Sequence, residues 1–290
     1  MSFNNQNLWA IILGGSSGIG LATAKKLATQ GLNLCIVHRD TGTRVKKIQP
    51  TFEELRQLGV RVETFNLDAS SPDQVDKICN QLIESEELKV RVLVHAISKG
   101  NLKTLVPPKS VKREKEATGD VDEKFGALDR LMESFQNDLG QLTESDLSVT
   151  THAMCTSLLL WVRRLVKQNS FSSPARVIAL SSEGNKRNWS SYAAIAMAKS
   201  SLETLIRYLA VELAPYNVTA NVIQAGITDT PSLNMIPGNE IIKASTVRRN
   251  PFGRLTTGKD VADFIYLMCL DEASWINGAI IPVDGGEHFC

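Results

Sequence analysis

The sequence lacks the features that define several large classes of protein. Its 290 residues carry 32 Lys and Arg against 31 Asp and Glu, so there is no basic excess for binding nucleic-acid backbones. No apolar run approaches the roughly 18 residues that a membrane-spanning helix needs. The N-terminal segment has neither the charged n-region nor the small-residue cleavage site of a signal peptide. We therefore expect no nucleic-acid partner, no membrane association and a cytoplasmic location.

Cysteine is scarce and scattered. The five residues form no CxxC pair and no cluster with histidine: Cys35, Cys79, Cys155, Cys269 and Cys290. Structural zinc sites use such pairs, and a disulfide framework uses an even number of cysteines. The pattern therefore predicts free thiols in a reducing compartment and no metal site.

The sequence does contain an alternation of short apolar runs and longer amphipathic stretches. Several runs are continuously apolar, which is typical of strands covered on both faces in a parallel sheet. Seven runs are expected to be strands, at residues 8–13, 32–37, 60–67, 90–97, 177–180, 218–223 and 279–283. The clearest helical patterns cover 21–30, 72–82, 191–213 and 261–270. This alternation predicts an α/β fold with a Rossmann-type, doubly wound parallel sheet of about seven strands.

One region breaks the alternation. Residues 98–141 contain no strand pattern and include a dense run of mixed charge at 109–116. Because a doubly wound domain of about 250 residues is common, we predict a single domain, 1–290, with this segment inserted after the fourth strand. The charge run is a candidate docking site for an acidic carrier protein, although mixed-charge loops are more often simply solvated.

A glycine-rich loop follows the first predicted strand. The sequence GGSSGIG occupies residues 14–20, where a helix begins. Glycines there allow a tight turn, the approach of a pyrophosphate to the backbone, and close packing of helix on strand. The helix N-terminus then offers free N–H groups to phosphate oxygens. The loop is predicted to bind a nucleotide through Gly14, Ser16, Ser17, Gly18, Ile19 and Gly20.

This loop resembles that of the short-chain dehydrogenase/reductase family, whose usual form is TGxxxGIG, with Leu13 here in place of the threonine. Four further segments follow in the family's order: NLD at 66–68, VHAI at 94–97 in place of NNAG, NVIQAG at 221–226 in place of NxVxPG, and DGG at 284–286. Each segment is weak evidence alone, but their shared order covers nearly the whole chain. The resemblance implies a nicotinamide-dependent oxidoreductase.

The resemblance also implies further cofactor contacts. The aspartate of NLD stands where the family touches the adenine amino group. The histidine of VHAI, through its backbone, and the alanine after it are expected beside the cofactor. Residues after NVIQAG are expected at the nicotinamide amide and the pyrophosphate, and 230–249 corresponds to the substrate loop of relatives. The expected contacts are Asp68, His95, Ala96, Ile227, Thr228 and Thr230.

The end of the second strand distinguishes NADH from NADPH. An acid there accepts hydrogen bonds from the ribose 2′-hydroxyl and repels a 2′-phosphate. By the family's spacing this position is His38, and Arg39 follows with a guanidinium that suits a phosphate. Arg44 is placed to assist. The pattern predicts NADPH, while Asp40 keeps NADH as the less favoured alternative.

Reductases of this family use a serine, a tyrosine and a lysine, commonly with YxxxK spacing. With that spacing the tyrosine would stand four residues before Lys199, but this position is Ile195. The nearest preceding tyrosine is Tyr192, seven residues before the lysine. Seven residues return nearly to the same helix face, so both side chains can reach one site. The family's serine, seventeen positions before the lysine, is Ser182. The resemblance implies that these three are catalytic, with the lysine holding the cofactor ribose and lowering the pKa of Tyr192.

The longer spacing resembles the enoyl-acyl-carrier-protein reductases of the family, and residues 192–213 are similar to their NADPH-using type III enzymes. The expected reaction is reduction of the C=C bond of an enoyl thioester, a small or carrier-bound acyl substrate, by a homo-oligomer (a tetramer or dimer). Two alternatives stay open: a carbonyl reductase or alcohol dehydrogenase of the same family, and a non-catalytic NADP(H)-binding sensor or partner subunit. Departures from the family pattern at Leu13, Ile195 and 224–225 keep the last one open.

Overall fold

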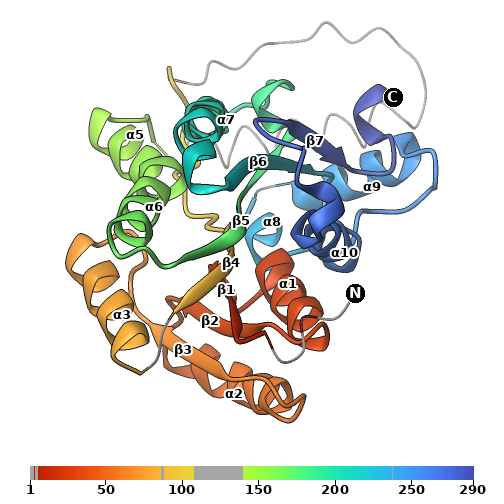
Figure 1. Cartoon of the computed structure of the whole chain (residues 1–290). Coiled ribbons are helices and arrows are strands. Elements are labelled where there is room, and N and C mark those ends of the chain that lie inside the picture. The colour runs from red at the N-terminus through yellow and green to blue at the C-terminus, as the bar shows by residue number, and fades with distance from the viewer. Residues whose placement is uncertain (1–2, 4–5, 86–87, 108–139, 237) are drawn as a thin grey trace, which may run out of the picture.

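Seven parallel strands form one sheet in the computed structural model of the chain (Figure 1). They are β1 (Leu8–Leu13), β2 (Asn33–His38), β3 (Val62–Asn66), β4 (Lys89–His95), β5 (Phe171–Ser182), β6 (Val218–Ala225) and β7 (Ile280–Val283). Their order is β3-β2-β1-β4-β5-β6-β7, so the direction of the winding reverses at β1. The predicted doubly wound sheet is confirmed. The structure describes residues 3, 6–85, 88–107, 140–236 and 238–290.

Helices cover both faces of the sheet (Figure 1). On one face lie α3 (Pro72–Ser85), α6 (Ser157–Lys167) and α7 (Ala193–Glu212). On the other lie α1 (Gly18–Thr29), α2 (Gly42–Arg56) and α10 (Gly258–Cys269). A short helix, α5 (Glu144–Thr151), continues into α6 through a π-helical turn at His152–Thr156. Two hydrophobic cores therefore enclose the sheet.

The side chains of β1 show why continuously apolar runs form this sheet. Trp9, Ile11 and Leu13 enter the core under α3, α6 and α7, whereas Ala10 and Ile12 enter the opposite core. All five are at most 2% exposed. Successive residues of a strand point to opposite faces, so a strand buried on both faces has to be apolar throughout.

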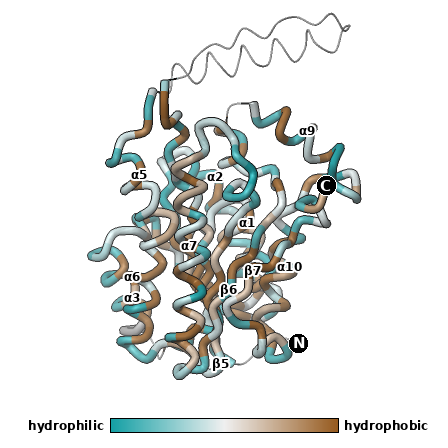
Figure 2. The backbone as a smooth tube through the Cα atoms, turned by 90° about the horizontal axis from the view of Figure 1, so that it is seen from above, coloured by the Kyte–Doolittle hydropathy of each residue, from teal (hydrophilic) through white to brown (hydrophobic). Residues whose placement is uncertain are grey.

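The carboxyl ends of the strands meet at one edge, together with the substrate segment and the described ends of the insertion. Figure 2 shows α9 (Asn239–Arg249) at this end of the molecule and the N-terminus near the opposite end. The Leu142 N–H donates to the Thr104 carbonyl at 2.8 Å, so the two arms of the insertion lie side by side. Residues 108–139 of the predicted insertion, including the charge run at 109–116, lie outside the described residues.

The segment 230–249 differs from the loop that the sequence predicted. It contains α8 (Pro231–Asn234) and α9. The Thr230 hydroxyl accepts a hydrogen bond from the Leu233 N–H at 3.2 Å, and Pro231 takes the first helical position. Gly238, with a φ of 72°, precedes α9. Pro231 and Gly238 thus stand where the two helices begin.

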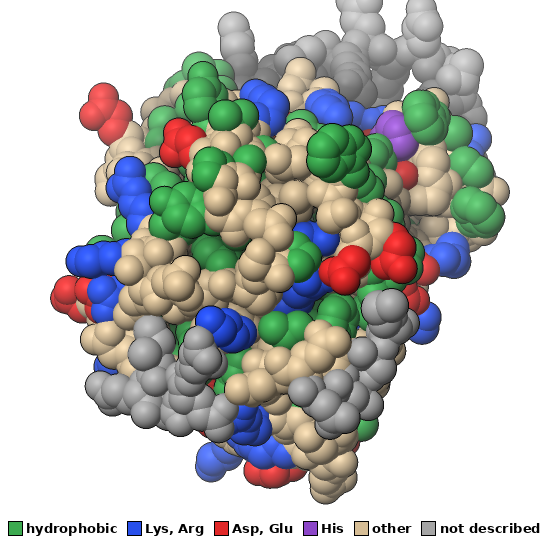
Figure 3. Space-filling view, in the orientation of Figure 1, with side chains coloured by type: hydrophobic (Ala, Val, Ile, Leu, Met, Phe, Trp, Pro, Cys, Tyr) green, Lys and Arg blue, Asp and Glu red, His purple; other side chains and the backbone are tan. Residues whose placement is uncertain are grey.

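The opposite end of the sheet, where the strands begin, holds two buried arginines. Arg91 Nε donates to the Cys269 carbonyl at 2.9 Å, and Arg176 Nε donates to the Met268 carbonyl at 2.8 Å. Arg91 also pairs with Asp271 at 2.6 Å. A hollow of about 270 Å³ beside Arg91 opens at this end, and Figure 3 shows the face, with acidic and basic side chains among hydrophobic ones. The buried positive charge here is satisfied by the end of α10, where helix carbonyls are free to accept hydrogen bonds.

Four cysteines are buried free thiols, whereas Cys290 is an exposed one. No helix within the described ranges combines the length and the apolar composition needed to cross a membrane. Over the same ranges, no three His, Cys, Asp or Glu side chains are grouped as metal ligands would be.

Candidate active site

The loop between β1 and α1 requires glycine at two of its positions. Gly14 has a φ of 90°, and a Cβ there would lie 2.8 Å from the Ala96 carbonyl oxygen. A Cβ on Gly20 would overlap the carbonyl oxygen of Gly14. Ser17, which precedes α1, makes no side-chain hydrogen bond to the first turn. The first N–H groups of α1 are therefore left for an anion, as at other phosphate-binding helix N-termini.

A cavity of about 620 Å³ lies at the carboxyl edge of the sheet. The glycine loop, the ends of β2, β5 and β6, the start of α7, and residues of α8 and α9 surround it. Its lining includes every predicted site residue except one: Gly14, Ser16, Ser17, Gly18, Ile19, Gly20, Arg39, Asp68, Ala96, Ser182, Tyr192, Lys199, Ile227, Thr228 and Thr230. Segments that are far apart in the sequence thus form one site.

His95 is the exception. Its side chain is fully buried, with Nε2 2.9 Å from the Ser157 hydroxyl, which itself donates to the Ala153 carbonyl at 2.8 Å. Burial, aided by the charge of Lys199, lowers the pKa of His95 to about 3. The ring is therefore neutral and packs between the sheet and α6. The structure places the cofactor wall at the next residue, Ala96, because successive strand residues point in opposite directions.

Ser182 and Tyr192 meet at the end of β5. Ser182 is the last residue of β5, and Tyr192 directly precedes α7, which begins two residues later than predicted. Both side chains line the cavity, and Ser182 acts on the pKa of Tyr192 as a hydrogen-bonding neighbour. The tyrosine ring packs on Gly184, where a Cβ would lie only 2.6 Å from Tyr192 Cε1. Lys199 lies in the second turn of α7 and lines the same cavity.

Ser181 and Ser182 have separate environments, which the sequence did not distinguish. The Ser181 hydroxyl donates to Glu203 Oε1 at 2.6 Å, and Asn185 Nδ2 donates to the same oxygen at 2.7 Å. Glu203 is buried, one turn beyond Lys199 on α7. Sequence reasoning missed this glutamate, although an acid four residues after a buried lysine is a signal for such a neighbour. Ser182 is the serine that contacts Tyr192.

Burial sets the protonation of Tyr192 and Lys199. It raises the pKa of Tyr192 above its usual value, and the hydrogen bond with Ser182 offsets part of the effect. It lowers the pKa of Lys199 to about 8, with neighbouring acidic groups acting in the opposite direction. Lys199 Nζ donates to the Leu180 carbonyl at 2.7 Å. The expectation that Lys199 lowers the pKa of Tyr192 is not met here, because the ammonium is directed to the main chain of β5.

The far end of the cavity lies beside the end of β2. Arg39 Nη1 lies 2.9 Å from Asp68 Oδ2, and the Arg39 side chain is 54% exposed. His38 is buried, with Nδ1 3.0 Å from one Asp40 oxygen, and Arg44 lies 3.6 Å from the other. Burial lowers the pKa of His38, although Asp40 acts to raise it. Asp40 is thus engaged by two neighbours, while both arginines border the cavity.

The loop after β6 closes the cavity opposite the glycine loop. A Cβ on Gly18 would lie 3.1 Å from Thr230 Cγ2, so these two predicted cofactor segments face each other closely. The Ile227 N–H donates to Glu287 Oε2 at 3.1 Å, and the Thr228 hydroxyl donates to a carbonyl two residues before it. The N–H of Ile227 is used inside the protein, so a cofactor contact from this residue has to come from its other atoms.

Apolar side chains form the remaining wall of the cavity, and the sequence did not predict most of them. Ile195, which stands where YxxxK spacing would put a tyrosine, packs on Gly100, where a Cβ would lie 2.6 Å from Ile195 Cγ1. Ala153 and Met154 reach the cavity from the π-helical turn, a feature without a sequence signature. Ile241 and Ile242, which the substrate segment supplies, also line it. The wall further includes Ile97, Leu102, Trp189, Leu233, Met235 and Ile236.

The site fits a dinucleotide along its length. Uncapped helix N–H groups lie at its middle, a buried lysine at one end and two arginines at the other. Family models match both parts of the chain: "short chain dehydrogenase" over residues 8–106 and "Enoyl-(Acyl carrier protein) reductase" over residues 109–288. The chain belongs to the short-chain dehydrogenase/reductase family. It is therefore an oxidoreductase, and the two models meet within the insertion.

Named relatives of this short-chain dehydrogenase/reductase act on different groups. An NADPH-dependent aldehyde reductase-like chloroplastic protein of Arabidopsis thaliana is 25% identical over 284 residues, which cover 96% of this chain and 93% of the relative. The enoyl-acyl-carrier-protein reductase (NADH) FabI of Aquifex aeolicus is 28% identical over 176 residues, 58% of this chain and 65% of the relative. Family membership thus leaves the group that is reduced undecided.

Solved structures share the fold. The enoyl-acyl-carrier-protein reductase (NADH) of Aquifex aeolicus aligns with a TM-score of 0.74 at 21% identity, covering 97% of this chain and 96% of that one. A short chain dehydrogenase of Burkholderia cenocepacia in complex with NADP aligns with a TM-score of 0.69 at 21% identity, covering 97% and 98%. Relatives of this fold therefore include proteins named for either nicotinamide cofactor.

Proposed function

We propose that this protein reduces the C=C bond of an enoyl thioester with NADPH. The placement of Tyr192 carries the proposal. Tyr192 stands at the start of α7, seven residues before Lys199, while Ile195 fills the usual tyrosine position with an apolar side chain in the same cavity. The family model named for enoyl reduction covers this whole region.

The protonation of Tyr192 supports this reaction. NADPH, when bound, supplies the hydride that adds to Cβ of the substrate. Negative charge then develops on the thioester oxygen, where a hydrogen-bond donor already in place stabilises the transition state, and the enolate takes up a proton at Cα to give the saturated thioester. Because burial raises its pKa, the Tyr192 phenol keeps its proton near neutral pH and acts as that donor. Ser182, at the end of β5, is placed beside the phenol in the same cavity.

Lys199 supplies positive charge close to the reacting atoms. Its pKa of about 8 leaves it mostly protonated at pH 7, and its hydrogen bond to Leu180 fixes the ammonium at the floor of the cavity. A cation in a buried site favours charge developing on the substrate oxygen more strongly than it would in water. The remaining N–H groups of the ammonium are available to the cofactor ribose.

The end of β2 supports NADPH over NADH. The carboxylate of Asp40, which is placed to repel a 2′-phosphate, is engaged by His38 and Arg44. Arg39 is exposed at the cavity, and its ion pair with Asp68 is a weak, solvent-screened contact. A 2′-phosphate would therefore meet Arg39 and Arg44 at the cavity, and Arg44 already offsets part of the charge of Asp40.

The apolar wall supports an acyl substrate. Isoleucine, leucine and methionine side chains from four segments line the cavity next to Tyr192. Such a wall removes water from the reacting carbons and favours a hydrocarbon chain over a polar sugar or amino acid. The acyl group can belong to a small thioester or to one attached to a carrier.

The experiment that tests the proposal follows NADPH oxidation separately with crotonyl thioester and acetoacetyl thioester. We expect turnover of the first, with butyryl thioester as the product. Turnover of acetoacetyl thioester alone would replace the proposal with carbonyl reduction. Binding of NADPH without turnover of either would favour a sensor or partner subunit.

Carbonyl reduction is the second candidate, and a specific observation favours it. A serine and a protonated tyrosine at one cavity are equally suited to a ketone oxygen. The 3-oxoacyl-acyl-carrier-protein reductase MabA of Mycobacterium bovis is 26% identical over 276 residues, 95% of this chain. The same pair of substrates distinguishes the two reactions.

We also propose that the protein works in the cytoplasm as a homo-oligomer, a dimer or tetramer. Large apolar side chains are exposed at Tyr208 and Val211 on α7 and at Trp275 before β7, where Trp275 is 97% exposed. Exposed apolar patches of this kind are typical of contact surfaces. The mass in solution, measured by light scattering, tests the proposal, and a monomer at micromolar concentration would contradict it.

A further inference from the structure

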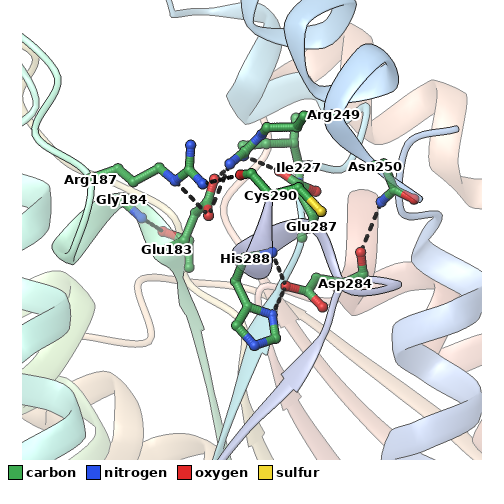
Figure 4. A network of polar contacts seen from close by, with 12 residues as sticks. Glu183, Gly184, Arg187, Ile227, Arg249, Asn250, Asp284, Glu287, His288 and Cys290 are labelled. Carbon is green, nitrogen blue, oxygen red and sulfur yellow. Dashed lines mark hydrogen bonds and ion pairs between the residues drawn. The ribbon is translucent and has the colours of Figure 1, made fainter. Parts of the chain in front are cut away.

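The substrate segment ends at Arg249, which lies between two buried carboxylates (Figure 4). Its guanidinium pairs with Glu183 through both terminal nitrogens, and Nη2 lies 2.5 Å from Glu287 Oε1. Glu183 is 6% exposed and Glu287 is fully buried. Arg249 therefore pairs with two anions that are both removed from solvent.

The two carboxylates belong to different parts of the site. Glu183 directly follows Ser182 at the end of β5. Glu287 accepts the N–H of Ile227, in the loop after β6, through the oxygen that is not paired with Arg249. Arg249 itself is the last residue of α9. The guanidinium thus connects the serine that contacts Tyr192, the loop facing the glycine turn, and the helix that covers the cavity.

Two further charged side chains lie beside this cluster (Figure 4). Arg187 is a second cation for Glu183, with Nε 3.2 Å from its carboxylate, and its Nη2 donates to the main-chain oxygen of Cys290 at 2.6 Å. His288 Nδ1 pairs with Asp284 at 2.6 Å. Within the described part of the chain, Arg249 is the cation that pairs with both Glu183 and Glu287.

The other attachment of α9 is weaker. Lys243 lies 3.1 Å from Asp229 and 3.1 Å from Glu240, and both carboxylates are more than half exposed. Exposed ion pairs are screened by water and contribute little to stability. Breaking a buried pair leaves an uncompensated charge and has a much larger effect. The ion pairs of Arg249 are therefore a stronger charged attachment of α9 than those of Lys243.

We propose that Arg249 is a positioning residue of the active site, which holds α9 against the Ser182 end of β5 and the Ile227 loop by neutralising Glu183 and Glu287 together. The inference rests on the proposed function only in taking 230–249 as the segment that covers the substrate. Without the guanidinium, two buried carboxylates remain with Arg187 as their near cation, and a shared proton replaces the lost charge as the pH falls. Burial already raises the pKa of Glu287, and Glu183 adds to this effect.

The test is hydrogen exchange on the full chain without substrate, at pH 8 and at pH 6. The variants are Arg249→Gln, the charge-balanced pair Arg249→Gln with Glu287→Gln, and Arg248→Gln as the control at the exposed neighbour. At pH 8, Arg249→Gln should raise exchange of α9 and of the Ile227 amide about tenfold over wild type. At pH 6 the increase should shrink to about threefold or less, because the carboxylates then hold a proton. The paired variant should show little pH dependence, and Arg248→Gln no change.

Three results would overturn the proposal: unchanged exchange in Arg249→Gln, an increase that is equal at both pH values, or equal pH dependence in the paired variant. If Arg249→Gln folds at pH 6 but not at pH 8, and the paired variant folds at both pH values, the result supports the proposal. If Arg249→Gln also fails to fold at pH 6 and the paired variant folds at neither pH, the proposal is contradicted. The exchange experiment uses no substrate, so its result does not depend on whether the protein reduces crotonyl thioester. With an active enzyme, Arg249→Gln should raise the substrate KM about tenfold at pH 8 and change the NADPH dissociation constant less.

Discussion

The two ends of this sheet bury charge for different purposes. Where the strands begin, Arg91 and Arg176 donate to carbonyl oxygens at the end of α10. Where the strands end, Lys199 and Tyr192 line a cavity, and each retains hydrogen-bonding capacity toward it. A buried charge satisfied by the protein stabilises the fold, whereas one left beside a cavity is available to a ligand. Substitutions at the two ends should therefore separate activity from stability.

The largest effect is expected at Tyr192. Tyr192→Phe removes the hydrogen bond to the substrate oxygen and should lower kcat about 100-fold or more, the usual effect of losing one oxyanion donor. NADPH affinity, measured by fluorescence titration, should stay nearly unchanged. Tyr208→Phe, at an exposed tyrosine of the same helix, is the matched control. Unchanged turnover in Tyr192→Phe would remove the tyrosine from the mechanism.

The pH dependence of Lys199 gives the next effect. Its ammonium form is lost as the pH rises through about 8, so kcat/KM should fall about tenfold one pH unit higher. Stability should change in the opposite direction. The unfolded lysine keeps its proton to a higher pH, so the cost of burying the ammonium disappears above pH 8. Thermal unfolding and kcat/KM, measured over the same pH range, check the two opposite changes. Lys199→Arg should reduce the fall of kcat/KM above pH 8.

At the other end, Arg176→Met should affect stability and leave the site intact. The substitution leaves buried carbonyl oxygens of Met268 and Leu270 without their donor, which should lower the free energy of unfolding by about 1–3 kcal/mol. Activity per folded molecule should stay within about twofold of wild type. Denaturant titration measures the free energy of unfolding, and Arg207→Met, at an exposed arginine, is the control. Loss of activity without loss of stability would contradict the division between the two ends.

The smallest effect is expected at Gly184. A Cβ there would press on the Tyr192 ring, so Gly184→Ala should displace the phenol and lower kcat several-fold, since misplacing a catalytic group by a fraction of an ångström is costly. Gly42→Ala, where a Cβ meets nothing within 4 Å, is the control. Equal kinetics for the two variants would show that the Tyr192 ring tolerates the shift.

Much of the fold followed from local patterns. Continuous apolar runs predicted strands such as β1 because burial on both faces leaves no polar position. The glycine turn was predictable for a similar reason, since Gly14 and Gly20 meet backbone atoms that no side chain can share. The separation of Tyr192 from Lys199 also placed both at one cavity.

Other features depended on residues distant in the sequence. His95 belongs to the core because Ser157 of α6 lies beside it, and Ser181 differs from Ser182 because Glu203 accepts its hydroxyl. Neither partner could be identified from the motifs alone.

The sequence by itself determined the class of the fold, the nucleotide loop and the spacing of the catalytic residues, because each rests on local periodicity or on backbone geometry. Only the tertiary structure decided which charged side chains are paired within the protein and which are available to a ligand. Arg249 is 66 residues from Glu183 and 38 from Glu287, and no short-range pattern links them. Their pairing arises because parallel strands end at one edge and bring distant segments into one buried, low-dielectric place, where unpaired charge is costly.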